Sequence, residues 1–190
     1  MQTNLLWTGR EYHSMENCLV NNTTACIEIT STIVGYYEEK IYKVDYLIKT
    51  NQNWETILLE INCRHNNQTQ LIRFEGDGKG NWISNGEKAE QFNGCIDVDI
   101  PLTPFTNTLP IRRLHLSQKQ TEEIQVIYCD LLERQIKVVR QKYTCLSNIK
   151  YHYENVPNDF ENTIQVDEFG FVVDYPSLFV RTAALKTNYR

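Results

Sequence analysis

The sequence predicts an all-β protein: an antiparallel barrel, sandwich or roll of roughly a dozen strands, with one short helix. Two observations predict this class. Apolar and polar residues alternate with a period of two along much of the chain, and turn-forming residues interrupt that alternation at short intervals. The length of 190 residues is typical of one domain, and neither a composition shift nor an internal repeat divides the chain. We therefore expect a single domain over residues 1–190.

The alternation is clearest in three segments, Tyr42–Thr50, Ile57–Cys63 and Tyr143–Glu154. In each, apolar and aromatic side chains occupy every second position, and polar side chains fill most of the positions between them. In the third segment the residues predicted to share one face are Tyr143, Cys145, Ile149, Tyr151 and Tyr153. Such alternation is typical of antiparallel strands that bury one face.

Turn signals separate these runs. They occur at Asn51–Asn53, Asp77–Gly80, Asn85–Gly86, Pro157–Asp159 and Asp167–Gly170. Asn85–Gly86 is the strongest hairpin signal, because both central residues of a tight primed turn need a positive φ, which asparagine and glycine tolerate.

The expected helix covers Thr108–Leu114. Thr108 can cap its first turn, and Pro110 fits only near a helix start, where its missing N–H is not needed. Ile111 and Leu114 then lie three residues apart on one face.

Charge and composition exclude some classes of partner. The formal net charge is −5 and the longest basic cluster is Arg112–Arg113, which argues against binding to nucleic acid or to an anionic membrane surface. The sequence has no signal peptide and no apolar run long enough to span a membrane, so we expect a cytoplasmic protein. The six cysteines are scattered without a CxxC pair, which favours free, mostly buried thiols.

The segment Gly94–Leu114 holds the highest concentration of residues that do not fit an alternating strand. It holds three of the five prolines, a Thr/Asn run, two alternate aspartates and a pair of arginines. Asp97 and Asp99 are predicted to share one face of a strand, about 6.6 Å apart along it. If that face is buried, the two carboxylates need partners, and Arg112 and Arg113 are the expected donors.

Three interpretations of this segment remain open. It is a structural polar network that fixes a turn, which we favour, or a polar cluster that binds hydroxyl-rich head groups, or a catalytic site. Catalysis by Asp97 and Asp99 alone is disfavoured, because a pair that cleaves a glycoside must flank the scissile bond, whereas these side chains point the same way. The histidines form no metal-binding motif, the chain has no specific enzymatic signature, and we expect no cofactor.

A second dense segment covers Asp167–Arg181. Phe171, Val173 and Tyr175 share one face of its strand, and Asp174 interrupts the opposite face. The aromatic side chains here predict a core seal or a subunit interface, or alternatively the lining of a site for an acyl or aromatic ligand.

These two segments resemble a known family. GCIDVDIPLTPFTNTLPIRRL, followed by VDEFGFVVDYPSLFVR, is similar to the bacterial family labelled "putative glycolipid-binding", formerly a domain of unknown function; fainter matches at Trp7 and Trp82 extend the resemblance over nearly the whole chain. The resemblance implies a spiral antiparallel β-roll wrapped around one helix, and a homodimer. The predicted helix would be the enclosed one.

Three functions compete on this basis. The first is binding of a glycolipid or similar amphiphile, with its chain on the concave sheet and its polar group near the motif. The second is a structural or interaction dimer without a small ligand, and the third is an enzyme acting on a sugar-containing small molecule. The candidate ligand-binding residues are Asp97, Asp99, Asn107, Arg112, Arg113, Asp174 and Tyr175.

Overall fold

A computed structural model describes residues 1–187, which form one continuous sheet of fifteen strands and one short α-helix. The first eight strands are β1 (Gln2–Gly9), β2 (Ser14–Asn22), β3 (Ile27–Tyr37), β4 (Lys40–Thr50), β5 (Thr56–His65), β6 (Gln68–Gly76), β7 (Trp82–Ser84) and β8 (Glu87–Lys88). Then follow the 3₁₀ turn η1 (Glu90–Phe92), β9 (Asp97–Asp99), the 3₁₀ turn η2 (Phe105–Asn107) and α1 (Thr108–Leu114). The last strands are β10 (Thr121–Asp130), β11 (Gln135–Ser147), β12 (Lys150–Val156), β13 (Glu161–Val166), β14 (Val172–Tyr175) and β15 (Phe179–Thr187).

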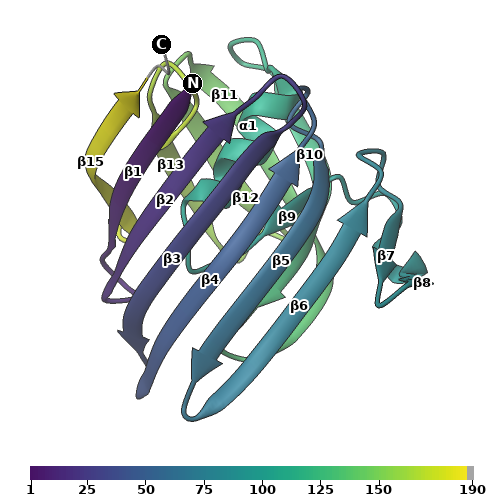
Figure 1. Cartoon of the computed structure of the whole chain (residues 1–190). Coiled ribbons are helices and arrows are strands. Elements are labelled where there is room, and N and C mark those ends of the chain that lie inside the picture. The colour runs from purple at the N-terminus through teal and green to yellow at the C-terminus, as the bar shows by residue number, and fades with distance from the viewer. Residues whose placement is uncertain (188–190) are drawn as a thin grey trace.

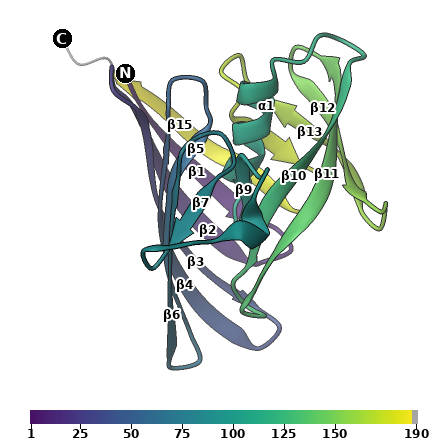
Figure 2. The same ribbon diagram turned by 90° about the vertical axis from the view of Figure 1, so that its right-hand side faces the viewer.

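The sheet is a roll with the first and last strands, β1 and β15, side by side at its middle. Its strand order is β8-β7-β6-β5-β4-β3-β2-β1-β15-β14-β13-β12-β11-β10-β9, and β1 pairs antiparallel with β15, so that Gln2 lies opposite Thr187. The strands up to β8 form one limb and those from β15 back to β10 form the other, with β9 paired to the last strand of the second limb (Figure 1). Turned by 90°, the molecule shows α1 and β9 between the two limbs (Figure 2). The predicted class, a mainly β roll around one short helix, is confirmed.

The alternation in the sequence forms the inner face of the first limb. In β4, Tyr42, Val44, Tyr46 and Ile48 are all buried, and the residues between them are exposed or half-buried. β-branched and aromatic side chains favour this pleated, half-buried setting. Strand β5 continues the same face and pairs with β4 along its full length.

The segment Tyr143–Glu154 is a hairpin and not one alternating strand. β11 ends at Ser147, β12 begins at Lys150, and Ile149 in the turn is 43% exposed, so its predicted place on the inner face is wrong. The hairpin register places Tyr143 opposite Tyr153, and both are buried. On both strands the buried tyrosines and the buried cysteine have odd residue numbers, so the alternation in the sequence continues across the turn without a break. The pattern alone therefore does not reveal the turn.

All five predicted turns lie between strands, and Asn85–Gly86 joins β7 to β8 with positive φ at both residues, 51° and 82°. Within the described residues no helix has the length and apolar composition that a membrane span requires. All six cysteines are free thiols, five of them buried, as expected.

The helix has the predicted bounds, Thr108–Leu114, but not the predicted cap. The 3₁₀ turn η2 runs directly into α1, so Asn107 takes the capping position, but its side chain makes no bond to the first N–H groups of the helix. The buried Thr108 hydroxyl has no partner within the described residues. Ile111 packs in the smaller hydrophobic cluster, with Leu114 against it, as their spacing predicts. Leu109 faces the larger cluster and is fully buried.

Candidate functional site

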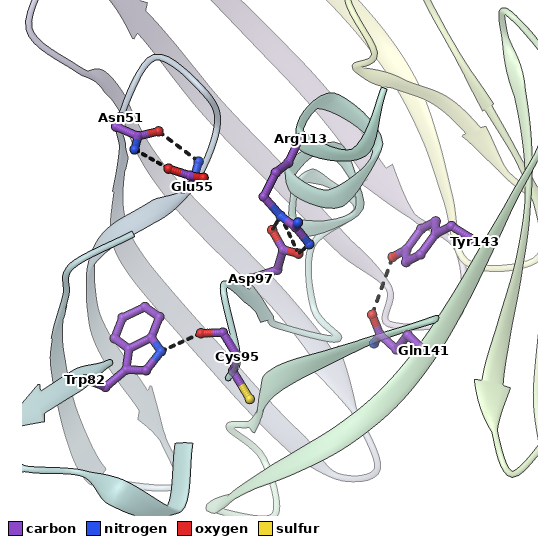
Figure 3. Close-up of polar contacts among 8 residues, drawn as sticks. All are labelled: Asn51, Glu55, Trp82, Cys95, Asp97, Arg113, Gln141 and Tyr143. Carbon is purple, nitrogen blue, oxygen red and sulfur yellow. Dashed lines mark hydrogen bonds and ion pairs between the residues drawn. The ribbon is translucent and has the colours of Figure 1, made fainter. Parts of the chain in front are cut away.

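The motif segment is fixed at its start to the end of the first limb. Gly94 has a φ of 90° and donates its N–H to the carbonyl of Gly80, 2.9 Å away. A Cβ on Gly80 would lie 2.9 Å from the backbone of Gly94, so this crossing requires a residue without a side chain. Trp82 donates its indole N–H to the carbonyl of Cys95 at 2.7 Å (Figure 3).

Strand β9 then passes between the limbs, which buries both of its faces. Asp97 and Val98 are at most 1% exposed, although they point in opposite directions. β9 pairs with β10, and this pair is parallel, unlike the antiparallel sheet that the sequence predicts. The connection through η2 and α1 explains the difference, since parallel neighbours need a crossover and usually a helix.

Asp97 is held by one of the two arginines. Arg113 reaches from α1 to both carboxylate oxygens, with Nη2 at 2.6 Å and Nε at 3.1 and 3.2 Å (Figure 3). The Asp97 side chain is fully buried and that of Arg113 is 15% exposed. Burial raises the pKa of Asp97, and Arg113 opposes that effect. The pair joins α1 to β9.

Arg112 does not contact either aspartate, so its expected role as their donor is wrong. Its guanidinium lies over the ring of Trp54, 5.1 Å from the ring centroid. Neighbouring residues of a helix point about 100° apart, so two adjacent arginines cannot both face β9. The donors to Asp99 are instead Thr106 at 2.8 Å and Gln141 at 2.6 Å, and burial raises the pKa of Asp99.

A cavity of about 270 Å³ lies beside Asp99, at the end of the roll where β1 turns into β2 and β14 turns into β15. Aromatic rings make up much of its wall, and carboxylate, amide and hydroxyl groups fill the gaps between them. Its lining residues are Glu11, Tyr12, Asp99, Pro101, Thr103, Asn107, Tyr128, Tyr153, Asn155, Phe160, Tyr175, Leu178 and Phe179.

The aromatic wall is continuous. Tyr175 contacts Tyr153, Phe160 and Phe179, with ring centroids 6.3 to 6.4 Å apart, and Phe179 stacks on Tyr12 at 5.8 Å. These rings come from turns and strands that are far apart in sequence and that the roll brings together.

Several polar groups at the cavity are left without a protein partner. Over residues 1–187, the hydroxyls of Tyr12, Tyr128 and Tyr175 make no hydrogen bond to the chain, whereas that of Tyr153 donates to Asn155 at 2.7 Å. Burial, followed by the charge of Asp99, raises the pKa of Tyr128 and of Tyr175, so both hydroxyls keep their protons. The cavity therefore offers hydroxyl donors and acceptors to a guest.

The structure brings three of the seven candidate residues into this cavity: Asp99, Asn107 and Tyr175. The other four lie elsewhere: Asp97 and Arg113 form the ion pair, Arg112 packs on Trp54, and Asp174 pairs with Arg10 at 2.8 Å.

Tyr12, Tyr128, Tyr153, Asn155 and Phe160 also line the cavity and were missed by the sequence reasoning. The sequence holds eleven tyrosines and no local pattern that marks these three.

A larger hollow of about 690 Å³ lies open on the outer face of β2–β6. Several polar side chains there already bond to one another, such as Thr32 to Asp45 at 2.7 Å and Arg73 to both Glu60 and Glu75. Within residues 1–187 it lacks an aromatic wall like that of the smaller cavity, so we assign the site to the smaller cavity.

Among residues 1–187, one group has the spacing of metal ligands: His152, Glu154 and Glu161 have ligand atoms within 4.8 Å of one another. The ammonium of Lys142 already lies 2.7 Å from Glu154 and neutralises it. Glu161 is exposed, and we assign no metal site here.

Comparison with known proteins identifies the family. A family model described as "Putative glycolipid-binding" matches residues 4–181. The chain belongs to this family. The match includes both segments on which the resemblance in the sequence rests and every residue that lines the cavity.

A solved structure has the same fold. The crystal structure of a DUF1089 family protein from Pseudomonas aeruginosa, at 1.80 Å resolution, is 32% identical in sequence with a TM-score of 0.79. The likeness covers 88% of this chain and 91% of that chain. No curated protein matches the chain.

Proposed function

We propose that this protein is a non-catalytic binding protein for a sugar-headed amphiphile, and that the sugar occupies the cavity beside Asp99. The family description supports binding of a glycolipid. The observation that carries the choice of site is the set of three tyrosine hydroxyls that line the cavity without a hydrogen bond to residues 1–187. These three hydroxyls are not among the fully buried unpartnered atoms of residues 1–187, so water reaches them in the free protein, and a guest rich in hydroxyls replaces that water with its own hydrogen bonds.

The chemistry of the wall suits a sugar ring. A pyranose has C–H groups on its faces and hydroxyls around its edge, and it needs flat apolar surface and hydrogen-bonding groups at the same place. Tyr175 and Phe179 supply ring surface. The side-chain oxygens of Asp99 and Asn107 each accept one hydrogen bond within the protein and have further lone pairs that can accept from a sugar.

The size of the cavity suits the sugar head group of the ligand and not its acyl chain. Its volume of about 270 Å³ lies below the roughly 300–1,000 Å³ that is usual for pockets holding a drug-sized ligand, so one ring fits and a long acyl chain does not. The space inside the roll, where the sequence-based hypothesis put the chain, is filled by Phe105, Leu109 and their neighbours. In our proposal the chain leaves along Phe160 and Leu178, which are apolar and half-buried at the cavity.

Calorimetric titration with octyl β-glucoside below its micellar concentration tests this function. We expect saturable binding of the glucoside and far weaker binding of 1-octanol, which has the same chain without the sugar. Tyr175→Phe keeps the ring but removes one hydroxyl, and should weaken glucoside binding about 3- to 10-fold, as the loss of one hydrogen bond implies. Tyr36→Phe, at an exposed site on β3, is the matched control. Equal affinity for the two ligands, or no binding of either, would contradict the proposal.

The homodimer and the cytoplasmic location also belong to this proposal. Exposed apolar side chains at Met15, Val34 and Ile41, on the neighbouring strands β2, β3 and β4, support a subunit contact. Five buried free thiols support a reducing compartment. Native mass spectrometry of freshly purified protein would detect a dimer and any retained lipid together, and subcellular fractionation tests the location.

A further inference from the structure

The charges around the cavity bear on which sugars it can accept. Two lining residues are acidic, Asp99 and Glu11, and within residues 1–187 no lysine or arginine lines the cavity. Asp130 and Asp159 lie close enough to act on Tyr128, whose pKa they raise further. The local field is therefore negative.

Among residues 1–187, three arginines in this part of the molecule are engaged with other groups, and one lysine stands outside the cavity wall. Arg113 is bound to Asp97 and Arg112 lies over Trp54, away from the cavity wall. Arg10 pairs with Asp174. Lys137 lies over the ring of Tyr128, 5.7 Å from the centroid, but it does not line the cavity.

An anionic sugar head would therefore enter a partly buried site whose lining, within residues 1–187, holds two carboxylates and no cation. Removing a charge from water without a partner is costly, and a like charge nearby adds to the cost. A neutral head meets no such penalty, because Asp99 accepts hydrogen bonds and the tyrosine hydroxyls both donate and accept them.

We propose that the cavity selects sugar heads without negative charge and rejects those bearing a carboxylate, sulfate or phosphate; this inference rests on the proposed function. Asp99 and Glu11 are its selectivity determinants. The amphiphile is then a neutral glycolipid and not a phosphorylated or uronic-acid one.

The test compares three ligands that share an octyl chain: the β-glucoside, its uronic acid with a carboxylate at C6, and the methyl ester of that acid. At pH 7.5 the glucoside and the ester should bind at least 10-fold more tightly than the acid. An acid that binds as tightly as the glucoside would overturn the selectivity and leave the proposed function intact. If none of the three binds, the proposed function itself fails.

Two charge-reversal variants test whether the selectivity between glucoside and acid arises at the cavity. Glu11→Lys changes an exposed residue that lines the cavity, and should narrow the affinity ratio between glucoside and acid several-fold. Glu87→Lys makes the same change of charge on exposed β8, away from the cavity, and should leave the ratio as in the parent. Equal shifts in both variants would assign the selectivity to net charge and overturn the role of Glu11. Melting temperatures check that both variants fold.

Discussion

At the scale of single residues, Glu16 is the most unusual titratable group. It lies on β2 at 1% exposure, and one carboxylate oxygen accepts bonds from Ser31 at 2.8 Å, Tyr46 at 2.7 Å and Thr103 at 2.9 Å. Within the described chain the other oxygen has no partner. Burial raises the pKa of Glu16 to about 7, and the three bonds only partly oppose it. Thr103 also lines the cavity, so this carboxyl group supports the cavity wall.

The raised pKa predicts a loss of stability as the pH rises. Between pH 4.5, the ordinary pKa, and about 7, the unfolded chain releases the Glu16 proton while the folded chain keeps it, so the free energy of unfolding falls across that interval. The fall amounts to roughly 3 kcal/mol and levels off above the folded pKa. Glu16→Gln cannot titrate, so we expect it to gain about 2.5 kcal/mol on the parent between pH 5 and pH 8.

Urea unfolding at the two pH values measures this gain. Glu87→Gln, at an exposed site on β8, is the control and should show no gain. If Glu16→Gln and the parent lose stability in parallel, Glu16 is already ionised in the folded protein at pH 5.

At the scale of elements, the Asp97–Arg113 pair joins α1 to β9, and β9 is the edge strand inside the roll. Removing one partner of a buried ion pair leaves the other charge uncompensated. Arg113→Ala should therefore lower the free energy of unfolding by about 3–5 kcal/mol. Denaturant unfolding measures the change.

Arg112→Ala provides a control with the same loss of charge one position away. It removes the contact with Trp54 and the packing of the Arg112 stem beside Gly170, and should cost about 0.5–2 kcal/mol. Equal losses in the two variants would show that the ion pair does not hold α1 to β9.

The helix and strands also show which features of the structure can be predicted from the local sequence and which cannot. The bounds of α1 follow from Pro110 and from the apolar pair Ile111 and Leu114, because these are properties of one segment. The parallel pairing of β9 was missed, although a helix between two strands is itself a signal for a crossover. Which arginine faces Asp97 depends on where β9 lies relative to α1, and no local period contains that information.

At the scale of the whole molecule, the period of two predicted the class of fold, and the resemblance to the family implied the roll. The cavity was predicted only in part. Asp99, Asn107 and Tyr175 lie in the two segments that depart most from the strand pattern, Gly94–Leu114 and Asp167–Arg181, whereas Tyr12 and Tyr128 lie in segments without such a signal. A pattern of alternation gives the face on which a residue lies but not its neighbours across the roll. The pairing of β1 with β15 closes the middle of the sheet and brings the turn after β1 close to Phe179.

A crystal structure of the protein with octyl β-glucoside at saturating concentration would show whether the cavity beside Asp99 is the sugar site. We expect a single sugar ring in the cavity, packed against Tyr175, with ring hydroxyls within hydrogen-bonding distance of Asp99. A sugar ring bound in the open hollow outside β2–β6, or a cavity that holds only water at that concentration, would contradict that expectation.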